Sequence, residues 1–277
     1  MLLRAAGAIT LLFVFSSNTY AFSLGDHAQI TLAAAAGIEH CLGRALPDAS
    51  VQALISANRG EDLNLLRKWT RYSHFYNPER PFDSLRLNSR ERIQDLEKQL
   101  RGCLGAGSCD KLLGKALHHV QDMASPPHVL VVNHLWTDGF EELNVPILPS
   151  FDFPSCDALL VEALSVTIAR VHQSTSEETW ALSRRGSLQA VRFERPRSRV
   201  LRLPLIAFWV PGARGGWGEY GAFGNTFGKE SLSTALGELW ISPVEYSRFK
   251  QARLQAALRA SQLVLARAWL LGFGPGR

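Results

Sequence analysis

The sequence predicts an all-α protein that forms one compact multi-helix domain over residues 22–277. Segments with apolar residues at helical spacing follow one another along the chain, and short breaks rich in Pro, Gly and Asn separate them. Hydrophobic residues make up 46% of the 277 residues and charged residues 20%, which is ordinary for a globular protein. The chain has neither a Gly-Xaa-Ser-Xaa-Gly nucleophile motif nor a P-loop, so we expect neither of these two chemistries.

The first 21 residues predict a secretory signal peptide. Arg4 precedes an apolar core from Ala8 to Phe15, and a Thr-Tyr-Ala sequence places small residues where a signal peptidase needs them. Cleavage after Ala21 would make Phe22 the mature N-terminus, so we expect a soluble product that is secreted or periplasmic. No later segment holds the 18 or more apolar residues that would predict a membrane span.

Two helices are predicted in the first part of the mature chain. An Ala-rich helix follows Phe22 and carries His27 near its start. Residues 50–57 are apolar enough to form a second, buried helix. We expect this helix to end at Asn58, because a glycine follows two residues later.

Residues 61–102 supply further candidate ligands and a third helix. Glu61 and Asp62 are adjacent carboxylates, and either one can serve as a ligand. His74 lies between aromatic residues in a proline-containing loop, where it is either a packing residue or a ligand. Residues 89–102 predict an amphipathic helix. Its inward-facing residues are Ile93, Leu96 and Leu100.

The stretch over residues 115–142 carries the strongest functional signal. It holds three histidines and two aspartates: His118, Asp122, His128, His134 and Asp138. The first and second lie four residues apart, so on a helix they point the same way and can hold one metal ion. Pro126 cannot continue that helix, so we expect His128 just past its end. Imidazole and carboxylate ligands without cysteine indicate a hydrolytic rather than a structural Zn²⁺ site.

The alternative interpretation of one such pair is a solvated ion pair on an exposed helix. Two pairs with a third histidine between them, in a chain with eight histidines, favour metal binding. His119 points about 100° away from its neighbour on a helix, so we expect it to pack or to support a ligand. His40 and His172 have no partner at helical spacing and are left out of the metal set.

The four cysteines fit an oxidising compartment and allow three pairings, among which the sequence does not decide. Cys103 and Cys109 flank a short loop, so we predict that bridge and pair Cys41 with Cys156. Free buried thiols are the alternative.

The second half begins with a proline-bounded connector at residues 146–154. Residues 156–171 predict a buried helix, with Val166 and Ile168 among its inward-facing residues. Seven arginines between Arg184 and Arg202 supply much of the formal net charge of +5. This basic stretch either contacts a polyanion or is a solvated loop.

Residues 203–228 mix glycines with aromatic residues. This composition suits a loop that enters a lipid interface or stacks on bases, and the alternative is a loop that folds over the helical core. Residues 243–271 predict the last helix, with Pro243 at its first position. Its apolar stripe is Leu254, Leu258, Leu265 and Trp269.

Four motifs together resemble the secreted zinc-dependent phospholipase C family and the related fungal zinc nucleases that cut single-stranded nucleic acid. They are an early histidine on an N-terminal helix, HFYNP, HHVQDMASPPH and HLWTDGF, in this order between Phe22 and Phe140. The C-terminal half resembles the superfamily only in being helical. The resemblance implies an all-α fold with up to three Zn²⁺ ions at the bottom of a cleft.

The resemblance also implies which residues bind each ion. The first ion would be held by Asp62, His74, His118 and Asp122. The second would be held by His128, His134 and Asp138. The third would be held by the α-amine and carbonyl of Phe22, by His27, and by Asp122 as a bridge. The family usually begins with Trp where this chain has Phe22, but backbone atoms are the ligands there.

The implied activity is that of a zinc-dependent phosphodiesterase in which a metal-activated water attacks phosphorus, with Asp62 and Asp122 as the catalytic carboxylates. HFYNP favours the phospholipase branch, so we expect hydrolysis of phospholipid head-group esters at a membrane surface. Asp138 favours the nuclease branch, with single-stranded nucleic acid as partner. The gap between His128 and His134 is shorter than in either branch, so a zinc-stabilised binding protein without activity is a further alternative. No protein partner is implied.

Overall fold

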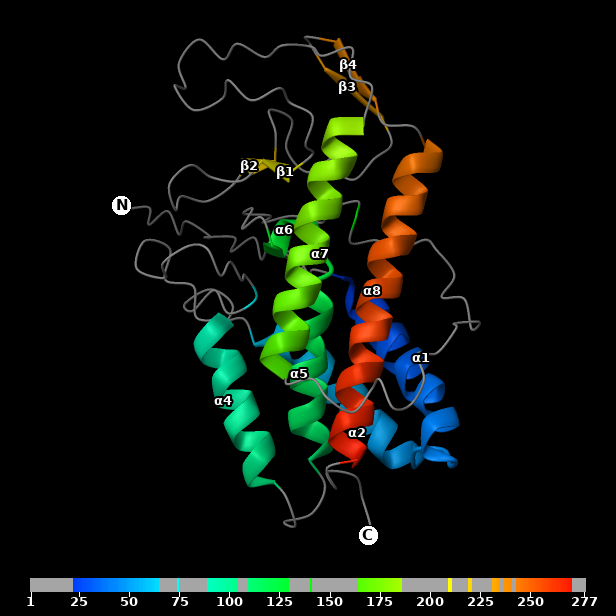
Figure 1. Cartoon of the computed structure of the whole chain (residues 1–277), viewed down its shortest axis with the longest axis vertical. Coiled ribbons are helices and arrows are strands. Elements are labelled where there is room, and N and C mark those ends of the chain that lie inside the picture. Colours follow the sequence, from blue (N-terminus) through cyan, green and yellow to red (C-terminus); the bar gives the residue numbers. More distant parts are fainter. Residues whose placement is uncertain are drawn as a thin grey trace, which may run out of the picture.

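The computed structural model describes residues 22–64, 74, 89–103, 109–129, 140, 164–185, 209–210, 219–220, 231–234, 237–240 and 243–270. This part of the chain is mostly helical, as the sequence predicts (Figure 1). The predicted signal peptide and two of the expected ligands, His134 and Asp138, lie outside the described residues.

The helices are α1 (Leu24–Leu42), α2 (Asp48–Leu63), α4 (Ser89–Gly102), α5 (Asp110–Asp122), α6 (Pro126–Val129), α7 (Leu164–Arg185) and α8 (Pro243–Leu270). The strands are β1 (Trp209–Val210), β2 (Glu219–Tyr220), β3 (Ser231–Thr234) and β4 (Gly237–Trp240). They form two antiparallel pairs, β1 with β2 and β3 with β4.

Helix α5 lies among the other long helices and packs against α1, α2, α4, α7 and α8. Figure 1 shows α4 on one side of it and α1 and α8 on the other. Its apolar residues at helical spacing are buried. They are Leu113, Ala116, Leu117 and Val120. Burying one leucine side chain contributes roughly 2 kcal/mol, so this helix anchors the core.

Helix α1 begins with a capping box that fixes the position of His27. Asp26 donates its backbone N–H to Ser23 Oγ at 3.1 Å, and Ser23 donates its backbone N–H to the Asp26 carboxylate at 3.1 Å. His27 then makes the first regular helical bond, from its N–H to Ser23 O at 3.0 Å. The helix ends at Gly43, whose φ of 64° favours glycine.

The expectation that the second helix ends at Asn58 is wrong, because α2 continues to Leu63. Asn58 is fully buried and bonds to side chains of α1 and α5, so tertiary contacts stabilise the helix beyond it. Gly60 is exposed, and one glycine in a helix costs only about 1 kcal/mol. As a consequence Asn58 and Asp62, four residues apart, share one face of a continuous helix.

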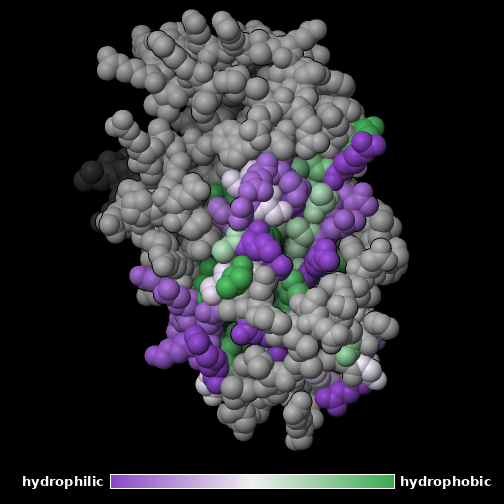
Figure 2. Space-filling view, in the orientation of Figure 1, coloured by the Kyte–Doolittle hydropathy of each residue, from purple (hydrophilic) through white to green (hydrophobic). Residues whose placement is uncertain are grey.

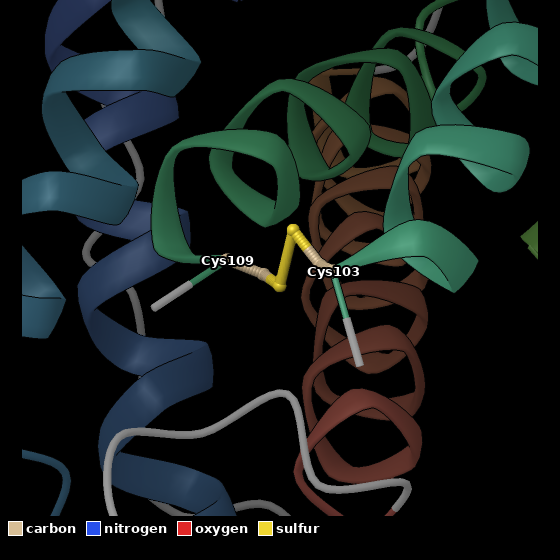
Figure 3. The surroundings of a disulfide bond; sticks show 2 residues. All are labelled: Cys103 and Cys109. Atoms are coloured by element: carbon tan, nitrogen blue, oxygen red, sulfur yellow. A yellow bond between two sulfur atoms is a disulfide. The ribbon is translucent and has the colours of Figure 1, made fainter. Parts of the chain in front are cut away.

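The predicted bridge between Cys103 and Cys109 is confirmed. It joins the end of α4 to the start of α5 (Figure 3). The link limits the freedom of the unfolded chain where the two helices meet. Cys41 is also disulfide-bonded, and Cys156, its predicted partner, lies outside the described residues.

Helices α7 and α8 lie side by side along most of their length (Figure 1). On α7, Ile168 is buried as predicted, but Val166 is 50% exposed, so its inward assignment is wrong. The helix turns the stripe of Leu164, Ile168 and Val171 toward its neighbours, and Val166 falls outside that stripe. The buried Arg253 of α8 donates to Thr175 Oγ1 at 2.8 Å, which ties the two helices together.

Two short pairs of antiparallel strands precede α8, and the first of them lies within the loop predicted over residues 203–228. Trp209 pairs with Tyr220 inside the predicted Gly-aromatic loop, so this segment is not entirely irregular. In the second pair of strands Ser231 pairs with Trp240. Strands of two to four residues are too short for a sequence pattern to reveal their periodicity.

The face in Figure 2 shows hydrophilic side chains over α4, α7 and α8, with hydrophobic ones between them. The predicted stripe of α8 is turned inward, since Leu254, Leu258 and Leu265 are buried. None of the helices in the described part of the chain combines the length and apolarity that a membrane crossing needs.

The close contact between α2 and α5 gives a testable prediction at Gly114. A Cβ at this position would overlap the Leu54 carbonyl oxygen and lie 2.9 Å from the Ala57 Cβ. We expect Gly114→Ala to destabilise the protein by about 1–3 kcal/mol, because the two helices must move apart. Urea denaturation would measure the change.

Gly60→Ala is the matched control, because a Cβ there meets nothing within 4 Å. Replacing a helical glycine by alanine should stabilise the protein by up to about 1 kcal/mol. Equal effects of the two substitutions would contradict the proposed helix contact.

Candidate metal centre

Six of the predicted ligand side chains lie within the described residues and converge at one end of α5. Each of them is no more than 1% exposed. His27 lies on α1, Asp62 on α2, His118 and Asp122 on α5, and His128 on α6. His74, the sixth, lies outside these helices. Imidazoles and carboxylates buried together without partners would cost several kcal/mol, so their arrangement requires a compensating interaction.

Helix geometry places the three ligands of α2 and α5. His118 and Asp122 lie one turn apart on α5, as the four-residue offset predicts. Asp62 lies near the end of α2, and the close packing of α2 on α5 brings it to the same place. Its Oδ1 is 3.8 Å from His118 Nε2.

Four donor atoms form a compact first group. His74 Nδ1 lies 2.9 Å from Asp122 Oδ2 and 2.9 Å from His118 Nε2. His118 Nε2 lies 3.3 Å from the same Asp122 oxygen. Asp62 Oδ1 completes the group, at 3.9 Å from His74 Nδ1 and 3.8 Å from His118 Nε2. These are the four residues expected for the first ion.

The spacing within this first group is close to that of the ligands of one metal ion. Ligand atoms at about 2.0–2.1 Å from one Zn²⁺ ion lie roughly 3.3 Å from one another when the geometry is tetrahedral. Five separations among these four atoms run from 2.9 to 3.9 Å and bracket that value. The buried histidines and aspartates can therefore hold a metal ion without a large rearrangement.

The other oxygen of Asp122 faces a second group. His27 Nε2 lies 3.5 Å from Asp122 Oδ1, and neither atom has a hydrogen-bond partner among the described residues. The same nitrogen lies 3.8 Å from Asp62 Oδ2. Phe22, whose backbone is an expected ligand, packs its buried ring edge-on against His27, with centroids 5.8 Å apart. Asp122 thus lies between the two groups, as a bridging ligand would.

His128 follows the end of α5, as expected, and it lies on the separate short helix α6. Helix α5 does end at Asp122, but Pro126 opens the single turn of α6, where a proline is favoured at the first position. His128 donates its Nδ1–H to His74 O at 2.8 Å, which makes Nε2 its metal-binding nitrogen. The other two residues expected for this ion lie outside the described part of the chain.

The adjacent carboxylates Glu61 and Asp62 have different environments. Glu61 accepts two hydrogen bonds from Arg92, at 2.8 and 3.2 Å, and one from His119 Nε2 at 3.3 Å. Lys115 Nζ lies 3.8 Å away. Asp62, and not Glu61, belongs to the groups of possible ligand atoms. Of these two neighbouring carboxylates, Asp62 is therefore the one that lies with the other candidate ligands.

Burial and hydrogen bonding set the protonation of this neighbouring pair. Burial raises the pKa of Glu61, but the hydrogen bonds and charges of His119 and Arg92 outweigh it and hold the pKa below its usual range. Burial lowers the pKa of His119 to about 4, and Glu61 offsets this only in part. At neutral pH a neutral His119 donates to an ionised Glu61.

Asp122 is ionised in spite of its burial. Burial alone raises the pKa of its carboxyl, but the neighbouring imidazoles of His118, His128 and His27 outweigh burial and hold the pKa well below its usual range. A carboxylate is the form that binds a metal ion.

Sequence reasoning missed two residues that touch the candidate ligands. Gln121 accepts a hydrogen bond from His27 Nδ1 at 2.6 Å, and Asn58 accepts one from His118 Nδ1 at 3.2 Å. Gln121 directly precedes Asp122, and Asn58 lies one turn before Asp62. Polar residues at buried helix positions beside ligands are the signal that could have revealed them.

No protein-family model, curated protein or solved structure matches this chain.

The Glu61–His119 pair predicts how stability depends on pH. The pKa of His119 falls from 6.5 to about 4 on folding, so the unfolded chain binds more protons in that window. The free energy of unfolding should fall by about 3 kcal/mol as the pH drops through it. The ionised form of Glu61 also stabilises the folded state, and this contribution is lost at still lower pH, where Glu61 becomes protonated.

The variant His119→Gln tests this assignment. Its amide can still donate to Glu61 but does not titrate, so the decline between pH 6.5 and 4 should be shallower than in the wild type. Urea denaturation across this range measures both slopes. Parallel curves for the two proteins would contradict the assignment.

Proposed function

We propose that this chain is an exported zinc-dependent phosphodiesterase of the phospholipase C type. The observation that carries the proposal is the convergence of five buried side chains into two groups of possible ligand atoms that share His118: one holds His27 and Asp122, the other Asp62 and His74. Asp122 has one oxygen 3.5 Å from His27 Nε2 and the other 2.9 Å from His74 Nδ1, and the resembled family uses an aspartate in such a bridging position to hold neighbouring ions.

Zinc is the proposed metal because of the chemistry of the donor set. Borderline nitrogen ligands with a few carboxylate oxygens suit Zn²⁺, whereas Mg²⁺ and Ca²⁺ prefer oxygen ligands alone. The described residues would supply all four ligands expected for the first ion and some of the ligands expected for the other two. His134, Asp138 and the α-amine of Phe22 would complete them.

Zn²⁺ bound at these groups supplies Lewis acidity toward phosphoryl oxygens and lowers the pKa of water to near 7. The residues of the chain hold and orient the reacting groups around it. Asp122 presents one oxygen to each ligand group. Asp62 is the second buried carboxylate, and we assign it the role of orienting the attacking water or accepting its proton.

The exported location follows from the N-terminal signal pattern and agrees with the disulfide between Cys103 and Cys109, since disulfides persist in oxidising compartments. A phospholipid surface would be the substrate. The nuclease activity is kept as the alternative, because Asp138 favours that branch.

A zinc-stabilised protein without catalytic activity is a second candidate, and one observation favours it. All six ligand side chains in the described residues are 0–1% exposed, which is the burial expected of a structural site. Metal binding would then serve mainly to stabilise the fold.

An assay of the mature secreted protein on phosphatidylcholine micelles and on single-stranded DNA and RNA separates these functions. We expect release of diacylglycerol that a chelator abolishes and added Zn²⁺ restores. Asp62→Asn serves as the matched variant, since it keeps the size of the side chain and removes the carboxylate charge. We expect it to lose most of the activity.

Release of nucleotides without diacylglycerol would contradict the phospholipase assignment and support the nuclease branch. Full zinc content with no hydrolysis of either substrate would support the binding protein. Hydrolysis that a chelator does not affect would contradict all three.

A further inference from the structure

A buried chain of hydrogen bonds connects His27 and His118, two histidines of the candidate site. It runs through Gln121 and Asn58 and involves side chains from α1, α2, α5 and α8. Every side chain in it is no more than 2% exposed, so water does not compete for these bonds.

The chain of hydrogen bonds begins at the Ser261 hydroxyl, which accepts a hydrogen bond from Gln121. Ser261 donates its hydroxyl to the backbone carbonyl of Ala257 at 2.8 Å. Its oxygen is then left to accept, and Gln121 Nε2 donates to it at 3.1 Å. Gln121 Nε2 also donates to Thr31 Oγ1 at 3.2 Å. The amide nitrogen of Gln121 therefore faces the two hydroxyls, and its Oε1 faces the opposite way.

This orientation continues to both imidazoles. Gln121 Oε1 accepts from His27 Nδ1 at 2.6 Å and from Asn58 Nδ2 at 3.0 Å. Asn58 Nδ2 also donates to Thr31 Oγ1 at 2.9 Å, so its Oδ1 is the atom that accepts from His118 Nδ1 at 3.2 Å. Because the two amides bond to each other, neither can reverse without the other.

We propose that the Gln121–Asn58 amide pair fixes His27 and His118 together in the tautomer that carries its proton on Nδ1, so that both Nε2 atoms face the metal. A neutral imidazole has one N–H and one lone pair, and a proton on Nδ1 leaves the lone pair on Nε2. Both Nε2 atoms lie beside Asp122, at 3.5 and 3.3 Å. A reversed amide pair would place N–H groups against Nδ1 and move both protons to the metal-binding nitrogens.

Gln121 and Asn58 are thus positioning residues, which act through the ligands and do not touch the metal. The inference rests on the proposed metal site and adds the residues that select the tautomer of its histidine ligands. Residues that orient metal-binding histidines in this way typically contribute about 10–100-fold to metal affinity.

Two substitutions at Gln121 test the proposal. Gln121→Leu keeps the approximate size and removes the acceptor. Gln121→Glu keeps an acceptor for His27 and Asn58, and the hydroxyls of Thr31 and Ser261 can turn to donate to it. The control Thr179→Val removes a buried hydroxyl on α7 outside the hydrogen-bonded chain.

The measurement is Zn²⁺ affinity by competition with a chromogenic chelator, with circular dichroism to verify that each variant is folded. We expect Gln121→Leu to bind Zn²⁺ about 10–100-fold more weakly than the wild type. Gln121→Glu and the control should bind it as tightly as the wild type. Rescue by glutamate would show that the acceptor matters, because a purely structural role of the amide would not be rescued.

The proposal is overturned if Gln121→Leu binds Zn²⁺ as tightly as the wild type, or if Gln121→Glu loses as much affinity as the leucine variant. If the leucine variant does not fold, the glutamate variant decides, since a tenfold or larger loss would contradict the role of the acceptor. A wild-type protein that binds no Zn²⁺ would overturn the metal site itself, and with it this inference.

Discussion

The Asp122 carboxylate is the group on which the rest of the site depends. It is fully buried at the carboxyl end of α5, where both burial and the helix dipole oppose a negative charge. Nitrogens of four histidines surround it: His74 at 2.9 Å, His118 at 3.3 Å, His27 at 3.5 Å and His128 at 3.8 Å. Positive charge in this pocket is therefore required, and a metal ion held by neutral imidazoles would supply it without protonating them.

The fold brings these histidines to one point through helix packing. Helix α5 contacts α1, α2, α4, α7 and α8, so its last turn is reached from several directions. The absence of a side chain at Gly114 lets α2 approach closely enough for Asp62 to join the site. The capping box at Ser23 sets where α1 begins and thus where His27 lies. Beside the ligands, Glu61, Arg92 and His119 form a separate charged group, which keeps Glu61 out of the site.

Much of this could be predicted from the sequence, and the parts that could not have physical reasons. Amphipathic periodicity located the helices, and the four-residue offset of His118 and Asp122 placed both on one face of α5. The continuation of α2 beyond Asn58 was missed, because it depends on buried contacts that local propensity does not contain. The sequence also left the choice between Glu61 and Asp62 open. Neighbouring helix residues point in different directions, but which of them faces the site is known only once the packing of the helix is known. The hydrogen-bonded amides were missed for the same reason.

X-ray absorption at the zinc edge of the secreted protein, as purified without added metal, tests the central claim most directly. We predict bound zinc with nitrogen and oxygen ligands at about 2.0–2.1 Å, the multiple-scattering pattern of histidine rings, and no sulfur shell near about 2.3 Å. Protein that contains no zinc, or zinc with sulfur ligands, would contradict the assignment of the His/Asp groups as the metal centre.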